Sequence, residues 1–325
     1  MNKLTTGLLA AVMLSVSPLA VQAQDVTIRV AYENNPGEPT DLVMQYWQEL
    51  IAERSNGEIA LELYPSSQLG SKTDITDQAI MGLNVITITD VGFLAEYEPD
   101  LGILYGPYLT DDPQKLFDIY DGEWFTEMSE KLRTEHGVRI VLPNLLYGVR
   151  HLISTRPVRS PEDMQGLKVR VPNNIMQIRA IEAMGAVATP MPLGDVYTAL
   201  AQGVIDAVEN PIAVLYGQRF HEEADHLSLI GYLTNTAMFV GGEAFFSTLS
   251  DEHMQIVEET AYEAGLYSQE LITNLDNEML EEMVAAGVEV IEVDIAPFQE
   301  LTRSVYEGFP EWSEGLYEMI QAQLQ

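Results

Sequence analysis

Cysteine is absent from the sequence of 325 residues. This absence excludes disulfide bonds, metal sites built from thiolates, cysteine nucleophiles and an anchor lipidated on cysteine. After Ala23 no segment approaches roughly 18 uninterrupted apolar residues, the length that a membrane-spanning helix needs. We therefore expect the remaining chain to be soluble and not membrane-inserted. A 46% hydrophobic composition can supply the core that must hold it together.

Basic residues are scarce, since 16 Lys and Arg face 50 Asp and Glu and the net charge is -34. Such a surface repels nucleic acid and anionic lipid, so neither is expected as a partner. Adaptation to a salty environment, where ions screen the charges, is the simplest interpretation. An acidic protein that binds an anion must build a local positive pocket against its own field. Each well-placed arginine is therefore informative.

The amino terminus has the features of a secretory signal. Met1-Asn2-Lys3 is positive, an apolar stretch follows from Leu8 to Val21, and Val21-Gln22-Ala23 has small residues where a signal peptidase cleaves. The apolar stretch is short and contains Pro18, which makes an uncleaved anchor the weaker alternative. We expect residues 1–23 to be a cleaved signal peptide and the mature chain to be periplasmic.

Familiar catalytic motifs are missing. The sequence has no G-x-S-x-G elbow, no phosphate-binding P-loop, no G-x-G-x-x-G after a strand and no H-E-x-x-H. No two of its histidines have a convincing metal spacing, and His221 and His226 lie in what we interpret as a solvated acidic turn. We expect no cofactor, no metal and no catalysis. An unfamiliar secreted enzyme with Glu33 or Asp90 as general base stays an alternative.

Strand and helix patterns alternate along the chain. Period-two patterns predict strands over 26–30, 59–63, 85–89, 137–142, 167–171 and 205–208. Helical patterns lie over 39–57, 75–80, 115–136, 174–184 and 195–202. This order predicts an α/β fold with a mostly parallel sheet and helices on both faces.

One amphipathic stretch, from Ser250 to Ala286, is longer than most helices of globular proteins. Such a helix could bridge two lobes. No internal repeat and no low-complexity linker is evident, which favours two lobes joined by several crossing segments.

Three stretches carry a resemblance to a known family. They are Tyr64–Gly70 (YPSSQLG), Tyr147–Arg150 (YGVR) with Gly166–Asn173 (GLKVRVPN), and Thr189–Leu200 (TPMPLGDVYTAL) with Gly203–Pro211 (GVIDAVENP). Together they resemble the substrate-binding proteins of tripartite ATP-independent periplasmic (TRAP) transporters, solute-binding family 7. The likeness extends from about Val26 to the end of the chain.

The resemblance implies a two-lobe periplasmic binding protein fold of type II-like form. The ligand cleft would lie between the lobes, with a long helix spanning both. We expect lobe I to comprise 24–147 plus 236–275, and lobe II 148–235 plus 276–325. The resemblance also implies delivery of the ligand to permease subunits in the membrane, driven by an ion gradient. We expect a monomer.

Arg170 occupies the place of the family arginine that grips the substrate carboxylate. A planar guanidinium offers two parallel donors that match a carboxylate, which lysine cannot reproduce. Pro172 would open a loop after the strand and leave Arg170 facing the cleft. The alternative is a salt bridge with one of the many acidic residues.

Other positions match the family less strictly. Arg150 corresponds to an arginine that assists in binding the ligand or holds the cleft, and Asn210 to an amide that bonds the substrate. An ordinary strand arginine and turn chemistry before Pro211 are the alternatives. Further expected pocket residues, each also explicable by surface exposure, are Glu33, Lys72, Asp90, Asn174 and Tyr147. Leu193 departs from the family, which often has an aromatic residue in this stretch, so the pocket wall could be roomier.

Two arginines argue for a ligand with at least one carboxylate. The polar residues around them favour a hydroxylated ligand, because buried polar side chains need partners. We therefore predict a sugar acid, such as a uronate, aldonate or keto-aldonate. A C4-dicarboxylate and an ectoine-like zwitterion are the second and third alternatives. A sensory binding protein of the same fold, which presents its ligand to a receptor, also stays open.

Overall fold

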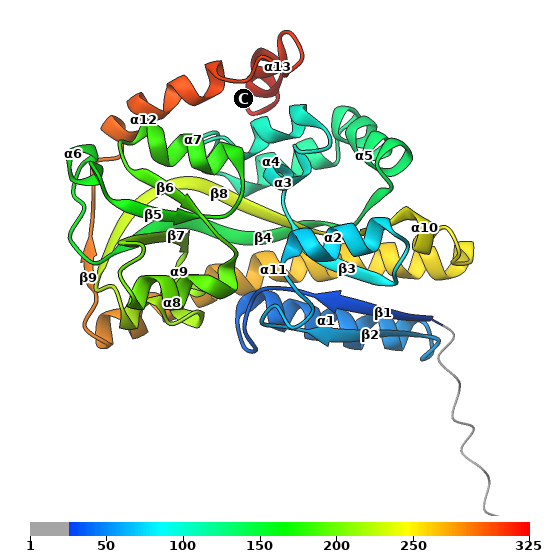
Figure 1. Cartoon of the computed structure of the whole chain (residues 1–325). Coiled ribbons are helices and arrows are strands. Elements are labelled where there is room, and N and C mark those ends of the chain that lie inside the picture. Colours follow the sequence, from blue (N-terminus) through cyan, green and yellow to red (C-terminus); the bar gives the residue numbers. More distant parts are fainter. Residues whose placement is uncertain (1–25) are drawn as a thin grey trace, which may run out of the picture.

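The structure is a computed structural model that describes residues 26–325 (Figure 1). The predicted signal peptide, residues 1–23, lies outside the described residues. No helix in the described part of the chain is long and apolar enough to cross a membrane.

Nine strands form one mixed sheet in the order β2-β1-β3-β8-β4-β7-β5-β6, with β9 paired to β8. The strands are β1 (Val26–Ala31), β2 (Ile59–Tyr64), β3 (Val85–Thr89), β4 (Val138–Ser154), β5 (Lys168–Val171), β6 (Val187–Pro190), β7 (Ala207–Pro211), β8 (His226–Gly242) and β9 (Glu289–Ile291). Pairing is parallel among β1, β2 and β3 and among β5, β6 and β7. It is antiparallel where β3, β4, β7 and β8 meet. The sequence predicted a mostly parallel sheet. This prediction is correct towards the two ends of the sheet and wrong at its centre.

The two central strands, β4 and β8, are 17 residues each and pair along most of their length with several register shifts. The sequence patterns predicted only the first part of β4 and missed β8. The last ten residues of β8 are all buried. A strand buried on both faces has no polar alternation, so the period-two signal is absent.

Helices cover both faces of the sheet (Figure 1). They are α1 (Pro39–Arg54), α2 (Lys72–Ile80), α3 (Val91–Leu94), α4 (Pro113–Tyr120), α5 (Glu123–Glu135), α6 (Pro161–Met164), α7 (Ile175–Ala183), α8 (Val196–Ala201), α9 (Ile212–Gly217), α10 (Glu243–Phe246), α11 (Asp251–Ala285), α12 (Ala296–Thr302) and α13 (Leu316–Gln323). Four 3-10 helices connect them: η1 (Pro99–Tyr105), η2 (Leu193–Asp195), η3 (Phe220–Glu222) and η4 (Arg303–Glu307).

The predicted helix over 115–136 is wrong as one element, because it is two helices that meet at Asp121 and Gly122. A Cβ at Gly122 would lie 3.0 Å from the carbonyl oxygen of Ile119. The glycine thus permits the tight turn that separates α4 from α5.

The long helix α11 confirms the prediction over 250–286 and is 35 residues long. Ser250 caps its first turn by accepting a hydrogen bond from the His253 amide. Its first half packs into a core with β1, α1 and β2 through Val257 and Ala261, whereas Met283 packs with β7, α8 and α9. One helix therefore stabilises both ends of the molecule.

The expected lobe boundaries fall within β4 (147/148), β8 (235/236) and α11 (275/276). The C-terminal segment contacts elements on both sides of these boundaries. Lys115 of α4 donates a hydrogen bond to the carbonyl of Leu324, while α12 packs on α7. The division into lobes stays a prediction.

Candidate ligand-binding site

The structure brings seven of the eight expected site residues around one pocket. Its walls come from segments far apart in sequence, including the ends of β1, β3, β5 and β7 and the middle of β4 and β8. The lining residues are Glu33, Lys72, Ile88, Thr89, Asp90, Tyr105, Tyr147, Arg150, Arg170, Pro172, Leu193, Asn210, Asn235 and Ala237. Asn174 is the expected residue that does not line it.

Arg170 lies in β5 and is only 3% exposed. Its Nε and Nη2 donate to the carbonyl oxygen of Met191, at 3.0 and 2.7 Å. Within residues 26–325 its Nη1 has no hydrogen-bond acceptor, and no carboxylate lies within ion-pair distance of the guanidinium. Burial lowers the pKa of Arg170, but a guanidinium stays protonated in proteins. The predicted alternative of a salt bridge is thus not what the structure contains.

Arg150, in β4, is held by Glu209 of β7. Its Nη2 donates to Glu209 Oε1 at 3.0 Å, its Nε donates to Oε2, and its Nη1 donates to Asn235 Oδ1 at 2.7 Å. Both partners are buried. Burial opposes the charged form, but Glu209 outweighs it and holds the pKa of Arg150 well above its usual range. Arg150 therefore has a structural partner, and its pocket-facing position leaves it able to assist a ligand.

Lys72 lies between two carboxylates at another part of the wall. Its Nζ is 3.5 Å from Glu33 Oε2 and 3.9 Å from Asp90 Oδ2, and it lies 4.4 Å from the ring centre of Phe93. Burial raises the pKa of Asp90, and Lys72 opposes this effect. With all three charged, this cluster carries one net negative charge. Its carboxylate oxygens can accept hydrogen bonds from ligand hydroxyl groups.

The remaining expected residues take different roles. Asn210, in β7, lines the pocket, and its side chain makes no hydrogen bond within the described part of the chain. Tyr147 also lines it, and its hydroxyl accepts a hydrogen bond from Asn34 Nδ2 at 3.1 Å. Asn174 caps α7 through Oδ1, and its Nδ2 donates to Asp90 Oδ1 at 3.3 Å. It therefore joins α7 to the start of α3 beside the pocket.

Sequence reasoning missed several residues of the pocket wall. Asn235 and Ala237 belong to β8, which had no strand signal, and Tyr105 ends η1. Glu209 stood in the Glu-Asn-Pro motif, but nothing in the motif showed that it pairs with Arg150. The apolar part of the wall includes Leu193, the position at which the sequence departs from the resemblance described above.

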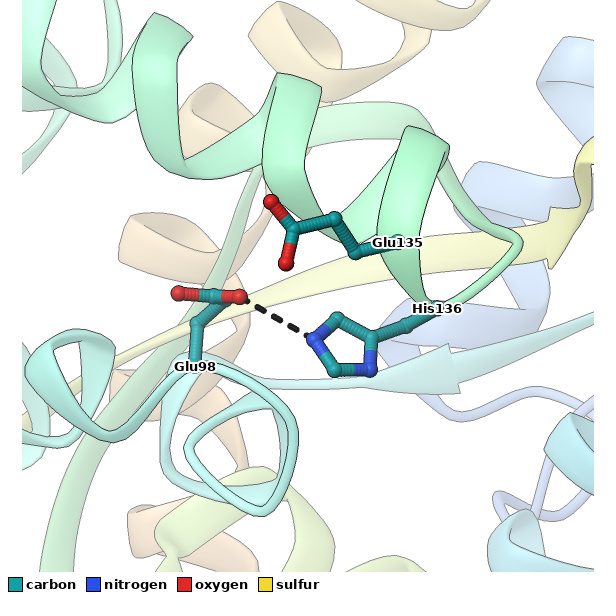
Figure 2. Close-up of side chains that lie close together, drawn as sticks. All are labelled: Glu98, Glu135 and His136. Atoms are coloured by element: carbon teal, nitrogen blue, oxygen red, sulfur yellow. Dashed lines mark hydrogen bonds and ion pairs between the residues drawn. The ribbon is translucent and has the colours of Figure 1, made fainter.

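One group of possible metal ligands exists in residues 26–325, and none of its members lines the pocket (Figure 2). It contains Glu98, Glu135 and His136, of which His136 Nε2 lies 3.1 Å from Glu98 Oε1. Glu127 chiefly raises the pKa of the neighbouring Lys131, and Glu98 and Glu135 contribute to this rise. A hydrogen bond between His136 and Glu98, with a lysine nearby, accounts for this arrangement.

A polar pocket that contains a buried arginine, with no carboxylate of residues 26–325 at ion-pair distance from it, suits a small anionic ligand. Residues 30–311 match the model of the family described as "Bacterial extracellular solute-binding protein, family 7". The chain belongs to this family of periplasmic solute-binding proteins of TRAP transporters, which work with a membrane permease.

Similar proteins support the assignment. A TRAP periplasmic solute-binding protein from Ochrobacterium anthropi, solved with bound L-fuconate, is 65% identical; the match covers 93% of this chain and 100% of that one, with a TM-score of 0.92. One from Actinobacillus succinogenes 130z, with bound L-galactonate, is 42% identical over 92% and 99% of the two chains, with a TM-score of 0.90. The 2,3-diketo-L-gulonate-binding periplasmic protein of Escherichia coli is 32% identical over 85% of this chain and 83% of its own length. The predicted family and two-lobe fold are confirmed.

Proposed function

We propose that this protein captures a six-carbon aldonate of the L-fuconate and L-galactonate type and delivers it to a TRAP permease. The observation that carries the proposal is Arg170, a buried guanidinium whose Nη1 faces no acceptor within residues 26–325. A ligand carboxylate would supply the missing partner in a bidentate pair. Two solved relatives with aldonates bound favour this ligand class.

The distribution of charge suggests how such a ligand would lie. Its carboxylate would meet Arg170, with Arg150 and Asn210 nearby on the same wall. Its hydroxyl groups would meet the cluster of Lys72, Glu33 and Asp90, which offers both donors and acceptors. With Lys72, Glu33 and Asp90 all charged, a second anionic group would meet a net negative charge there. A C4-dicarboxylate therefore fits less well than a monocarboxylate with hydroxyl groups.

Binding would shift the molecule towards a closed form. We place the flexing segments where β4, β8 and α11 pass between residues 24–147 with 236–275 and residues 148–235 with 276–325. A ligand that contacts both lobes binds the closed form more tightly, and this difference drives closure. The permease would recognise the closed form and use an ion gradient for uptake.

We also propose how the protein is exported, where it acts and in which oligomeric state. Residues 1–23 would be cleaved on export, and the mature protein would act as a monomer in the periplasm without catalysing a reaction. Nucleic acid would not bind to a chain with a net charge of -34.

A thermal-shift and calorimetric panel tests the ligand. The panel contains L-fuconate, L-galactonate, D-galacturonate, 2,3-diketo-L-gulonate, succinate and ectoine. A ligand at a hundred times its Kd adds about 2.7 kcal/mol to the stability of the folded state. We expect the two aldonates to give the largest shifts and succinate none. Equal or larger stabilisation by succinate or ectoine, or none by any sugar acid, contradicts the proposal.

A further inference from the structure

A second set of contacts joins α1 to α9 outside the pocket. Gln218, at the end of α9, donates through Nε2 to Glu38 Oε1 at 2.7 Å, and Glu38 immediately precedes α1. Beside this bond Asn35 Nδ2 donates to the carbonyl of Gly217 at 3.2 Å. Glu38 is 4% exposed and also accepts from Asn34 Nδ2 and the Asn35 amide.

The two sides of this contact belong to different hydrophobic cores. Residues of α1 pack with β1 and β2, whereas residues of α9 pack with β7 and α8. Gly217 allows the close approach, because a Cβ there would lie 2.4 Å from the Cγ of Glu38. None of Glu38, Gly217 and Gln218 lines the pocket.

Tyr147 connects this contact to the pocket. It lines the pocket wall, and its hydroxyl accepts a hydrogen bond from Asn34, whose Nδ2 also donates to Glu38 Oε2 at 2.7 Å. Two hydrogen bonds, through Asn34, therefore connect Glu38 to Tyr147 in the pocket wall.

We propose that Glu38 and Gln218 form a latch that stabilises the closed arrangement and so raises ligand affinity without touching the ligand. The inference rests on the proposed function, since it concerns closure around the same pocket. The latch would be made when α9 approaches α1 and broken when the lobes separate. Each contribution to the closed form lowers the apparent Kd by removing part of the cost of closing.

Titration of Glu38 should make the contribution of the latch to ligand affinity depend on pH. Burial raises the pKa of Glu38 to about 7, the hydrogen bonds from Asn34, Asn35 and Gln218 oppose the rise, and Asp41 adds to it. Two other titratable groups of the described residues face Glu38: Asp41 on α1 and Tyr147 on β4. Burial raises the pKa of Tyr147, so this hydroxyl group stays uncharged at neutral pH. On the α9 side, Arg219 follows Gln218 but pairs with Glu222.

The raised pKa of Glu38 determines the direction in which affinity changes with pH. Where closure buries Glu38, the closed form binds a proton more tightly than an open form with an exposed carboxyl group. The closed form is then favoured below pH 7 and loses this advantage as the pH rises through 7. Affinity should fall between pH 6 and pH 8, by up to about tenfold if opening exposes Glu38 fully.

The experiment measures the Kd of L-fuconate at pH 6, 7 and 8 by calorimetry. Glu38→Gln keeps an oxygen acceptor for Gln218 but cannot titrate, so it should bind with near-maximal affinity and lose its part of the pH dependence. Gly217→Ala places a methyl group against Glu38 and should weaken binding several-fold at every pH. Alanine suits a helix better than glycine, so this variant should still fold. Glu49→Gln, an exposed site on α1, is the matched control and should behave as wild type.

The absence of native cysteine permits an independent measurement on ligand-free protein. Spin labels on Met81→Cys and Val187→Cys, both at exposed positions, report the separation of α2 from β6. We expect Gly217→Ala to shift the distances towards those of an open form, and wild type to open more at pH 8 than at pH 6.

The outcomes separate the two proposals. If wild type binds no sugar acid, the proposed function fails while the spin-label distances still test the latch. If Glu38→Gln and Gly217→Ala match Glu49→Gln in Kd, pH profile and label distance, the latch is overturned.

Discussion

Arg170 and Met191 form a contact in which two N–H groups of one guanidinium converge on one carbonyl oxygen. Met191 directly follows β6, which pairs in parallel with β5. The contact fixes the plane of the guanidinium and leaves the edge formed by Nη1 and Nη2 for another acceptor. The sheet thus orients Arg170 through contacts within the protein, which lowers the entropic cost of binding.

Substitution of Arg170 should abolish tight binding. We expect Arg170→Ala to weaken L-fuconate binding by about 100-fold or more, because a charge-assisted bidentate pair is lost. Arg170→Lys should restore only part of the affinity, since an ammonium group cannot offer two parallel donors to a carboxylate. Calorimetric titration gives the Kd values, and circular dichroism controls for folding. An unchanged Kd in Arg170→Ala would exclude Arg170 as the carboxylate anchor.

The buried pair of Arg150 and Glu209 should matter mainly for stability. Glu209 also accepts hydrogen bonds from Tyr232 Oη at 2.6 Å and Gln177 Nε2 at 3.2 Å. Glu209→Gln leaves the charge of Arg150 buried without compensation, which costs about 3 kcal/mol or more. Urea unfolding measures the loss.

The matched control for this prediction is an exposed ion pair. Arg54 and Glu263 lie 2.8 Å apart with roughly half-exposed side chains. Glu263→Gln should cost less than about 1 kcal/mol, because solvent screens such pairs. If Glu209→Gln and Glu263→Gln lower the free energy of unfolding equally, the buried pair contributes no more to stability than the exposed pair.

The fold and the site were predictable to different degrees. Local patterns predicted β1, β3, α7 and α11 closely. Alternation, helix caps and amphipathic spacing depend only on the residues of the segment itself. Arg170 was found through a motif and needed no knowledge of its neighbours. The absence of a carboxylate of residues 26–325 within ion-pair distance of Arg170 could not be predicted in a chain with 50 acidic residues, because it depends on which strands lie beside β5.

Glu209 shows more clearly which contacts could not be predicted from the sequence. It lies two positions from Pro211, the residue opposite Arg150 in the antiparallel pairing of β4 with β7. Such a diagonal neighbour follows from strand register, which the sequence leaves open. Asn174 was expected to line the pocket for the same family reason as Tyr147. Its side chain is used instead for the helix cap and the bond to Asp90.

Asn174 offers a test of the contact between α7 and Asp90. In Asn174→Asp the new carboxylate can still cap α7, so the start of this helix should be preserved. The same carboxylate would face Asp90 at the distance where Asn174 Nδ2 now donates, 3.3 Å. Repulsion should weaken L-fuconate binding by about tenfold or more.

Asn174→Ser is the matched control, because serine caps a helix without adding charge. It should lose the bond to Asp90 and bind more tightly than Asn174→Asp. If Asn174→Asp binds as well as Asn174→Ser, the contact with Asp90 has no part in closure.

Asp276, in the second half of α11, should make stability depend on pH. Its Oδ1 accepts a hydrogen bond from the Ala213 amide at the start of α9, and burial raises its pKa to about 6. Because the folded state then binds the proton more tightly than the unfolded state, this carboxyl group favours folding at low pH. That advantage is lost as the pH rises through 6. Asp276→Asn keeps the acceptor for Ala213 but cannot ionise. Its stability relative to wild type should increase by about 1 kcal/mol between pH 5 and pH 8, as measured by urea unfolding at both values. A constant difference between the two proteins would mean that Asp276 titrates alike in the folded and unfolded chain.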